Sequence, residues 1–205
     1  RGVGIRVVVG DQTGYAFSED LDEIAMCEAA RTAASIAVAG GGAPVQGFRS
    51  CAGADLYPLR EHWDEVRVDR KLPLLRRTEE LARSLDPAVE KVTVSWANAD
   101  SRVLILTSEG KLVTDRRPMA RLVCSVVANR GGERQSNSAN VAGRRGMDWF
   151  DEERISAMAR DAVERTMVLY EARRPPAGQM PVVLAAGASG ILLHEAVGHG
   201  MEADF

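Results

Sequence analysis

The sequence predicts an α+β fold, in which an antiparallel sheet is flanked by helices. Two observations carry this prediction. Residues 89–142 form short runs of alternating or β-branched apolar side chains separated by turn residues, which is typical of strands. Residues 21–36 and 151–173 repeat apolar side chains at helical spacing instead. Because the strands are consecutive and their turns are short, we expect neighbouring strands to pair as a meander.

The first forty residues predict a hairpin followed by a helix. Val3–Val9 is a β-branched run, and Tyr15–Ser18 is its expected partner across a Gly-containing turn. Asp20, with Glu23 three residues later, is a helix-start signature. We expect this helix to end at Gly40–Gly42, because three consecutive glycines cannot sustain it.

The middle of the chain predicts a loop, a helix and then strands. Residues 43–70 follow no regular period, and we expect a surface loop or a poorly packed extension there. Pro73 suits a first helical turn, and Asp86-Pro87 should end the helix that follows. Strands are expected at Val92–Trp96, Val103–Leu106, Leu112–Thr114, Arg121–Ala128 and, as a polar return strand, Glu133–Val141.

The last third of the chain predicts a domain boundary. The pattern of Asp151–Arg173 predicts a helix with an acidic first turn and a basic last turn. A Pro- and Gly-rich linker follows this helix. We therefore expect residues 1–176 to form an N-terminal α+β domain that is truncated at its N-terminus. Residues 177–205 should be the start of a second, catalytic domain, with a buried strand at Pro181–Ala186 and a helix from Ile191.

Composition narrows the class of protein. The net charge of −3 is too small to argue for a nucleic-acid or membrane surface, and no apolar run is long enough to span a bilayer. Cys27, Cys51 and Cys124 are odd in number and far apart, which indicates reduced thiols in a cytoplasmic protein. We expect Cys27 and Cys124 in the core and His62 at a surface or interface. Since the chain opens on Arg1 within a strand pattern, we expect it to be an internal piece of a longer protein.

The strongest functional signal is the segment His194-Glu195-Ala196-Val197-Gly198-His199, which holds two of the three histidines. Two imidazoles can hold a zinc ion, and a carboxylate beside them can take a proton from water. The residues therefore predict a zinc site with His194 and His199 as ligands and Glu195 as the general base. The competing interpretation, of two ordinary helix histidines beside a solvated charge, is less favoured for this bracketed arrangement.

The spacing of the two histidines predicts an irregular backbone. At about 100° per residue, side chains five apart on an α-helix diverge by about 140° and cannot reach one metal ion. The helix must therefore contain a π-bulge or end near Gly198, and the glycines at 198 and 200 would permit this. By proximity alone Glu202 or Asp204 could be a third ligand, but we expect that ligand beyond Phe205.

Other signals are weaker. Ser189 follows a Gly-containing turn, but the turn has neither the lysine of a phosphate-binding loop nor the spacing of a nucleophile elbow, so we expect only a tight turn. The arginine pairs at 76–77, 116–117 and 144–145 are expected to be solvated.

Residues 194–205 resemble the H-E-A-x-G-H-x-L-E-G-D signature of the TldD branch of the TldD/PmbA family, also called modulator of DNA gyrase. Three further segments resemble family segments and support the match: Arg1–Val7, Asp115–Pro118 and Gly143–Gly146. Met201 and Ala203 depart from the signature, where the family has Leu and Gly.

The resemblance implies a cytoplasmic zinc metallopeptidase that acts on small or unfolded peptides, as in peptide maturation or antitoxin degradation. It implies a paralogous sister subunit of the TldE/PmbA type, or a homodimer, with no membrane and no direct nucleic-acid contact. It also implies that His194 and His199 bind zinc together with a cysteine of the C-terminal domain, and that this chain alone is inactive. The alternative is a non-catalytic scaffold or binding subunit of a peptidase complex.

Overall fold

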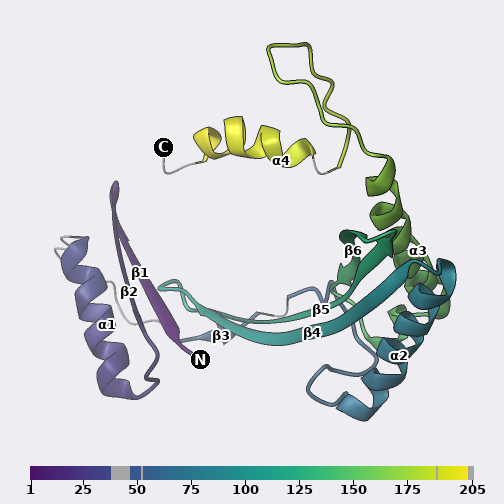
Figure 1. The fold of residues 1–205 in the computed structure, drawn as a ribbon. Coiled ribbons are helices and arrows are strands. Elements are labelled where there is room, and N and C mark those ends of the chain that lie inside the picture. Colours follow the sequence, from purple (N-terminus) through teal and green to yellow (C-terminus); the bar gives the residue numbers. More distant parts are fainter. Residues whose placement is uncertain (38–46, 52, 188, 203–205) are drawn as a thin grey trace.

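The computed structural model describes residues 1–37, 47–51, 53–187 and 189–202 and confirms the α+β class (Figure 1). Its strands are β1 (Val3–Val9), β2 (Gln12–Ser18), β3 (Arg49–Ser50), β4 (Val89–Leu106), β5 (Lys111–Arg130) and β6 (Glu133–Gly143). Its α-helices are α1 (Glu23–Ile36), α2 (Val68–Leu85), α3 (Glu152–Met167) and α4 (Ser189–Leu193). Short 3-10 turns, η1 (Met147–Trp149) and η2 (Val168–Glu171), flank α3.

The N-terminal hairpin is confirmed, and α1 packs on it. β1 and β2 pair antiparallel from Val3 opposite Ser18. Gly14 in β2 allows this packing, because a Cβ built there would lie 1.8 Å from the carbonyl oxygen of Ala33 in α1. The prediction that Cys27 lies in the core is wrong, because this residue is on the exposed side of α1.

The predicted start of α1 is also wrong. The N-cap is Asp22, whose Oδ1 accepts a hydrogen bond from the Ala25 N–H at 2.8 Å, so Asp20 lies outside the helix. The helix ends at Ile36. The glycines at 40–42, where we expected the end, lie outside the described residues.

The main sheet is built around β5. β4 pairs antiparallel with one edge of β5, and β6 pairs antiparallel with the Ala120–Arg130 part of the other edge. This confirms the predicted meander. β3, which we did not predict, pairs parallel with β5 at Lys111 and Leu112. Figure 1 shows α2 and α3 at one end of the long β4–β5 ribbon, with the hairpin and α1 by the other end.

The two predicted interruptions of the sheet are wrong, because β4 and β5 each run unbroken. Pro118 lies in the middle of β5, opposite Asp100 of β4. The even-numbered residues in this part of β5 direct their backbone N–H and C=O groups away from β4. The Leu112 carbonyl oxygen, for example, accepts a hydrogen bond from the Cys51 N–H at 2.9 Å, on the side opposite β4. A proline at such a position removes no hydrogen bond to β4, and the strand continues.

Helices α2 and α3 cover one face of this sheet. The core contains Leu122, Cys124 and Val126 of β5, all with 0% exposure, so the prediction for Cys124 is confirmed. The predicted apolar stripe of α3 is also confirmed, with Ile155, Met158, Ala159, Ala162 and Val163 buried. Asp151 caps this helix by accepting from the Arg154 N–H at 2.9 Å.

Trp63 brings part of the 43–70 segment into the core, although we expected a surface loop or a poorly packed extension there. Only 3% of this residue is exposed. Its ring centroid lies 5.4 Å from that of Trp96 and 6.3 Å from that of Phe150. Its indole N–H donates to the carbonyl oxygen of Arg145 at 3.1 Å. A large aromatic side chain with its N–H satisfied anchors the loop to the sheet.

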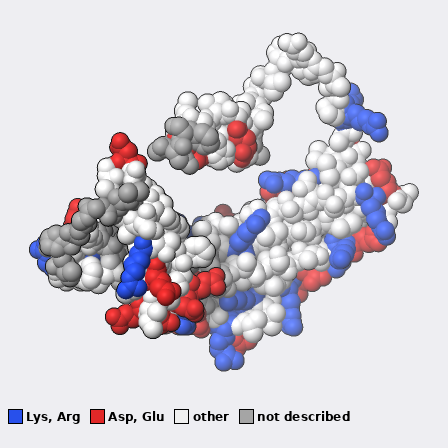
Figure 2. All heavy atoms as spheres, turned by 90° about the vertical axis from the view of Figure 1, so that its left-hand side faces the viewer, with Lys and Arg blue, Asp and Glu red and all other residues white. Residues whose placement is uncertain are grey.

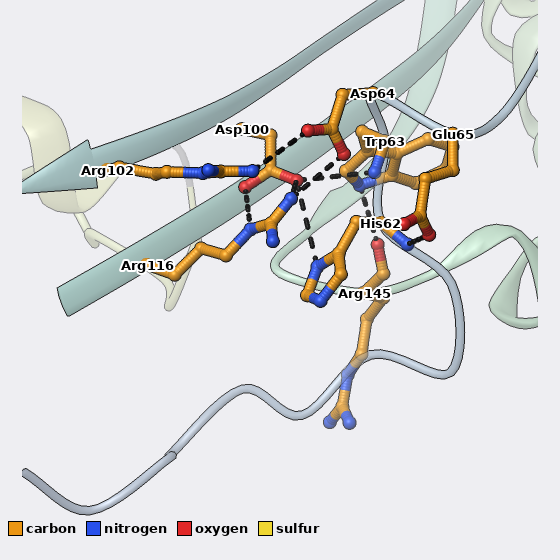
Figure 3. Close-up of polar contacts among 8 residues, drawn as sticks. All are labelled: His62, Trp63, Asp64, Glu65, Asp100, Arg102, Arg116 and Arg145. Carbon is orange, nitrogen blue, oxygen red and sulfur yellow. Dashed lines mark hydrogen bonds and ion pairs between the residues drawn. The ribbon is translucent and has the colours of Figure 1, made fainter.

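A charged cluster ties this loop to β4 and β5 (Figure 3). Arg116 donates two hydrogen bonds to the Asp100 carboxylate, at 2.7 and 2.6 Å, and a third to Asp64 at 2.9 Å. The Trp63 backbone N–H also donates to Asp100, at 3.3 Å. Arg116 is therefore paired and half-buried rather than solvated as expected, while the half-buried His62 has its Nδ1 3.8 Å from Asp100.

Asp100 should make the stability of this sheet depend on pH in the acid range. Hydrogen bonding from Arg116, helped by its charge, lowers the pKa of Asp100 below its ordinary value of 3.8, although burial opposes the shift. Because the pKa of Asp100 is lower in the folded state than in the unfolded state, the ionised carboxylate stabilises the fold at any pH above the unfolded-state pKa. This stabilisation is lost as the pH falls through the folded-state pKa. We expect Asp100→Asn to be less stable at neutral pH and to lose less stability between about pH 5 and about pH 2. Thermal unfolding midpoints measured across this pH range test the prediction, with a substitution of an exposed residue, Asp148→Asn, as the control. If Asp100→Asn and wild type lose the same stability in acid, the account is contradicted.

The chain after α3 differs from the prediction. The helix ends at Met167 and continues only as η2, short of the predicted Arg173. Residues 181–185 form no strand, and Val183 is 94% exposed, so the predicted buried strand at Pro181–Ala186 is wrong. The predicted domain boundary after residue 176 falls in this extended segment and stays a prediction.

The surface is of mixed charge. Figure 2 shows basic and acidic side chains interspersed over the face in view, which fits the net charge of −3. Among the residues that the structure describes, none of the helices combines the length and the apolar character needed to cross a membrane.

Candidate metal centre

The predicted backbone irregularity between the two histidines is confirmed. α4 changes at His194 into a π-helical turn, η3 (His194–Gly198), which is followed by a 3-10 turn, η4 (His199–Met201). The His199 N–H donates to the carbonyl oxygen of His194, five residues earlier. A π-helical turn adds one residue per turn, so it returns side chains five apart to the same face.

This turn brings together all three residues that the sequence singled out. The ring centroids of His194 and His199 lie 4.4 Å apart. One donor atom each from His194, Glu195 and His199 lie within 4.8 Å of one another. Two imidazole nitrogens beside a carboxylate oxygen are donors that zinc accepts, so the residues present fit such an ion. The assignment of ligands and base remains a prediction.

The Glu202 carboxylate contacts the Nδ1 nitrogen of His199. Its Oε1 is 2.6 Å from His199 Nδ1, while Glu195 Oε2 is 3.4 Å from His199 Nε2. A carboxylate on Nδ1 fixes the ring and its tautomer and leaves Nε2 to bind the metal. The geometry therefore suits Glu202 as an orienting residue rather than as the third ligand. Asp204, the other candidate, lies outside the described residues.

Gly198 provides space for the His194 ring. Its φ of −59° and ψ of −46° are ordinary for a helix, so freedom of the backbone is not what this position requires. A Cβ built on Gly198 would lie 3.1 Å from His194 Nδ1. At Gly200, by contrast, a Cβ would meet nothing within 4 Å.

We therefore expect Gly198→Ala to displace the His194 ring and to weaken zinc binding. A displaced ligand ring should have the same effect as the loss of a contact that orients a metal ligand. Such a loss typically weakens metal affinity by about 10-fold to 100-fold. Competition against a chromogenic chelator measures the affinity in full-length protein. Gly200→Ala is the matched control and should bind zinc as wild type does. Equal affinities for the two variants would remove the role assigned to Gly198.

The helix that carries the site is exposed along its length. Ile191, Leu192 and Leu193 of α4 are 61%, 61% and 58% exposed, and the three candidate site residues are exposed as well. The Ser189 hydroxyl donates to the Ala185 carbonyl oxygen, as expected for a residue in a local turn.

Comparisons with known proteins show the family of the chain. The family model described as PmbA/TldA metallopeptidase central domain matches residues 61–170, and the model described as PmbA/TldA metallopeptidase domain 1 matches residues 1–37. A Haemophilus influenzae protein named Metalloprotease TldD homolog is 36% identical over the whole chain. The chain spans 44% of the length of that relative.

Two solved structures share the fold. One, from Thermotoga maritima, is described as a modulator of a DNA gyrase; it has a TM-score of 0.61 and 17% identity, over 86% of this chain and 39% of its own. The other is TldE from Thermococcus kodakarensis, with a TM-score of 0.52 and 18% identity, over 79% of this chain and 36% of its own. Since a family model covers more than half of the chain and the relative matches all of it, the chain belongs to the PmbA/TldD metallopeptidase family.

Proposed function

We propose that the full-length protein is a zinc-dependent peptidase that hydrolyses small or unfolded peptides. The observation that carries the proposal is the π-helical turn η3, which gathers donor atoms of His194, Glu195 and His199 within 4.8 Å. A regular α-helix would separate the two imidazoles by about 140° around its axis.

Each residue has a chemical role in this proposal. His194 and His199 hold the zinc ion, and Glu202 keeps the His199 ring oriented through Nδ1. When bound, a zinc ion would supply Lewis acidity that favours the attack of water on a peptide carbonyl. The Glu195 carboxylate accepts the proton of the attacking water and then donates it to the leaving amine. A catalytic zinc usually has three protein ligands, and we propose that a cysteine after Phe205 is the third.

We further propose that the protein works in the cytoplasm together with a sister subunit of the TldE/PmbA type or with a second copy of itself. The family resemblance of the signature segment supports this arrangement. The exposed apolar side chains of α4 fit a segment that other parts of an assembly cover.

Removal of zinc tests the proposed function. We expect a zinc chelator to abolish hydrolysis of an unfolded protein such as reduced casein by the full-length protein. Added zinc should restore hydrolysis and added magnesium should not, because imidazole ligands suit zinc and carboxylate and water ligands suit magnesium. Hydrolysis that continues in zinc-free protein would contradict the proposal, whereas no hydrolysis even with zinc bound would favour the scaffold alternative.

A further inference from the structure

His62 lies where a loop that borders a groove meets the sheet. The groove has a volume of about 1090 Å³; residues between Gly53 and Leu59 line one side of it, and β4 and β5 line the other. His62 lines this groove as well, and it directly precedes Trp63, the buried residue that anchors the loop. A change in how His62 is held therefore affects the loop wall of the groove.

One ring nitrogen of His62 is unsatisfied. Its Nδ1 is buried and makes no hydrogen bond with any residue that the structure describes. Asp100 Oδ2 is 3.8 Å away, whereas an N–H···O hydrogen bond is about 2.7–3.2 Å long. The Asp100 side chain is only 7% exposed. A buried polar atom without a partner costs free energy, and a movement of about 1 Å toward Asp100 would give Nδ1 a partner.

The charge of the imidazole decides how well this bond can form. In one neutral tautomer Nδ1 is an acceptor, which repels the carboxylate oxygen. In the other it donates, but without a charge the bond is about half as strong. In the protonated ring both nitrogens are donors, so Nδ1 donates to Asp100 with the help of the charge. Imidazoles change charge between about pH 5 and pH 8, a range in which ordinary carboxylates and guanidinium groups keep theirs.

The side chains that contact one another around His62 hold one excess negative charge. They are three carboxylates and two guanidinium groups from the loop, β4 and β5 (Figure 3): Asp64, Glu65, Asp100, Arg102 and Arg116. Arg145 takes part only through its carbonyl oxygen, and its guanidinium points away from the His62 ring. A protonated imidazole would supply the cation that balances the excess carboxylate.

The charged groups farther from the ring do not supply this cation. The remaining charged side chains that line the groove are two of each sign: Asp55, Asp115, Arg117 and Arg144. Glu61, which precedes His62, is paired with Arg70. From α2, Lys71 lies over the Trp63 ring and donates to Asn98.

We propose that His62 is a pH-sensitive clamp, in which protonation of its ring fastens the Gly53–Leu59 wall of the groove to Asp100 of β4 and deprotonation releases it. The proton comes from solvent and adds to a ring nitrogen, and the hydrogen bond from Nδ1 is the only other bond that forms. The clamp does not depend on the proposed peptidase function, because none of the candidate metal-site residues belongs to this cluster.

The clamp acts on the loop rather than on the whole sheet. Asp100 keeps other partners when His62 is neutral, because Arg116 donates to it at 2.7 and 2.6 Å and the Trp63 N–H at 3.3 Å. Loss of the His62 proton therefore removes one attachment of the loop and leaves the others. The stabilisation is present at mildly acidic pH and is lost as the pH rises through the titration of the imidazole.

Hydrogen exchange at the amides of His62, Trp63 and Glu65 tests this inference in the full-length protein. These amides donate to Glu65, Asp100 and the His62 carbonyl oxygen, so they report how firmly the loop is held. Protection is the intrinsic exchange rate at each pH divided by the measured rate. We expect protection at about pH 5.5 to exceed that at about pH 8 by about 10-fold, the effect of one hydrogen bond to a charged group.

Three variants assign the pH dependence. His62→Gln can donate to Asp100 at either pH, so its protection should be the same at both. Asp100→Asn removes the carboxylate and should also lose the pH dependence. Asp115→Asn, which changes a carboxylate of the same groove outside the cluster, is the matched control and should keep the difference of about 10-fold. Circular dichroism shows whether Asp100→Asn is folded; if it is not, the other two variants still decide.

Equal protection of the wild type at the two pH values would overturn the inference. A pH dependence that persists in His62→Gln would overturn it as well, because another group would then be responsible. Loss of the pH dependence in Asp115→Asn would contradict the assignment of Asp100 as the partner.

Discussion

Replacing Glu195 with glutamine should lower peptide hydrolysis by about 10²-fold to 10⁴-fold, the usual contribution of a general acid–base group. The amide has nearly the same shape as the carboxylate but cannot accept a proton. Zinc should stay bound, because His194 and His199 are unchanged. Initial rates with a quenched fluorescent peptide, measured alongside zinc content, check both parts of this prediction.

Glu202→Gln is the matched control within the same segment. Glu202 contacts His199 Nδ1 at 2.6 Å, so its loss should weaken zinc affinity and leave hydrolysis near normal once zinc is saturating. If Glu195→Gln keeps wild-type activity, or loses activity only because zinc is lost, Glu195 is not the general base.

Replacing Trp63 with alanine should destabilise the sheet-and-helix unit by about 3–5 kcal/mol, the range for removing a large aromatic side chain from a core. Trp63 is 3% exposed and packs against Trp96 and Phe150. Its removal would leave a cavity and would also leave the Arg145 carbonyl oxygen without its donor. Because the loop has few other buried side chains, the neighbouring residues cannot refill that space.

Hydrogen exchange at the amides of Leu122, Cys124 and Val126 measures this loss locally in the full-length protein. Trp63→Phe is the control: it loses the indole N–H and one of the two fused rings but keeps an aromatic ring, so we expect a smaller loss. A change below about 1 kcal/mol in Trp63→Ala, within the range of ordinary surface substitutions, would show that the loop is not anchored by this residue.

Local sequence patterns were sufficient to predict the α+β class, the N-terminal hairpin and the apolar stripe of α3. These features depend on spacing within one element, and spacing is visible in the sequence. The exposed position of Cys27 was not predictable in the same way, because it depends on which face of α1 the hairpin covers.

The long strands could not be predicted because their continuity depends on contacts between strands. Polar residues near Asp100 and the proline at 118 indicate turns when each strand is considered alone. In the sheet, Arg116 neutralises Asp100, and Pro118 faces the edge that β4 does not use. Similarly, Trp63 lies in an irregular segment with no period to show that it is buried.

The candidate site was predictable to a greater extent than the fold around it. Five-residue spacing of His194 and His199 excludes a shared face on a regular α-helix, and this reasoning predicted either a π-bulge or a helix end near Gly198. The contact of Glu202 with His199 could have been found from its spacing of three residues.

Zinc content of the full-length protein tests the central claim most directly. Elemental analysis of wild type should give about one zinc ion per chain, and the double variant His194→Ala/His199→Ala should have lost it, because a catalytic zinc depends on its histidine ligands. The Gly200→Ala protein, purified in parallel, should retain zinc. Equal zinc in wild type and double variant, or none in either, would contradict a metal centre at this π-helical turn.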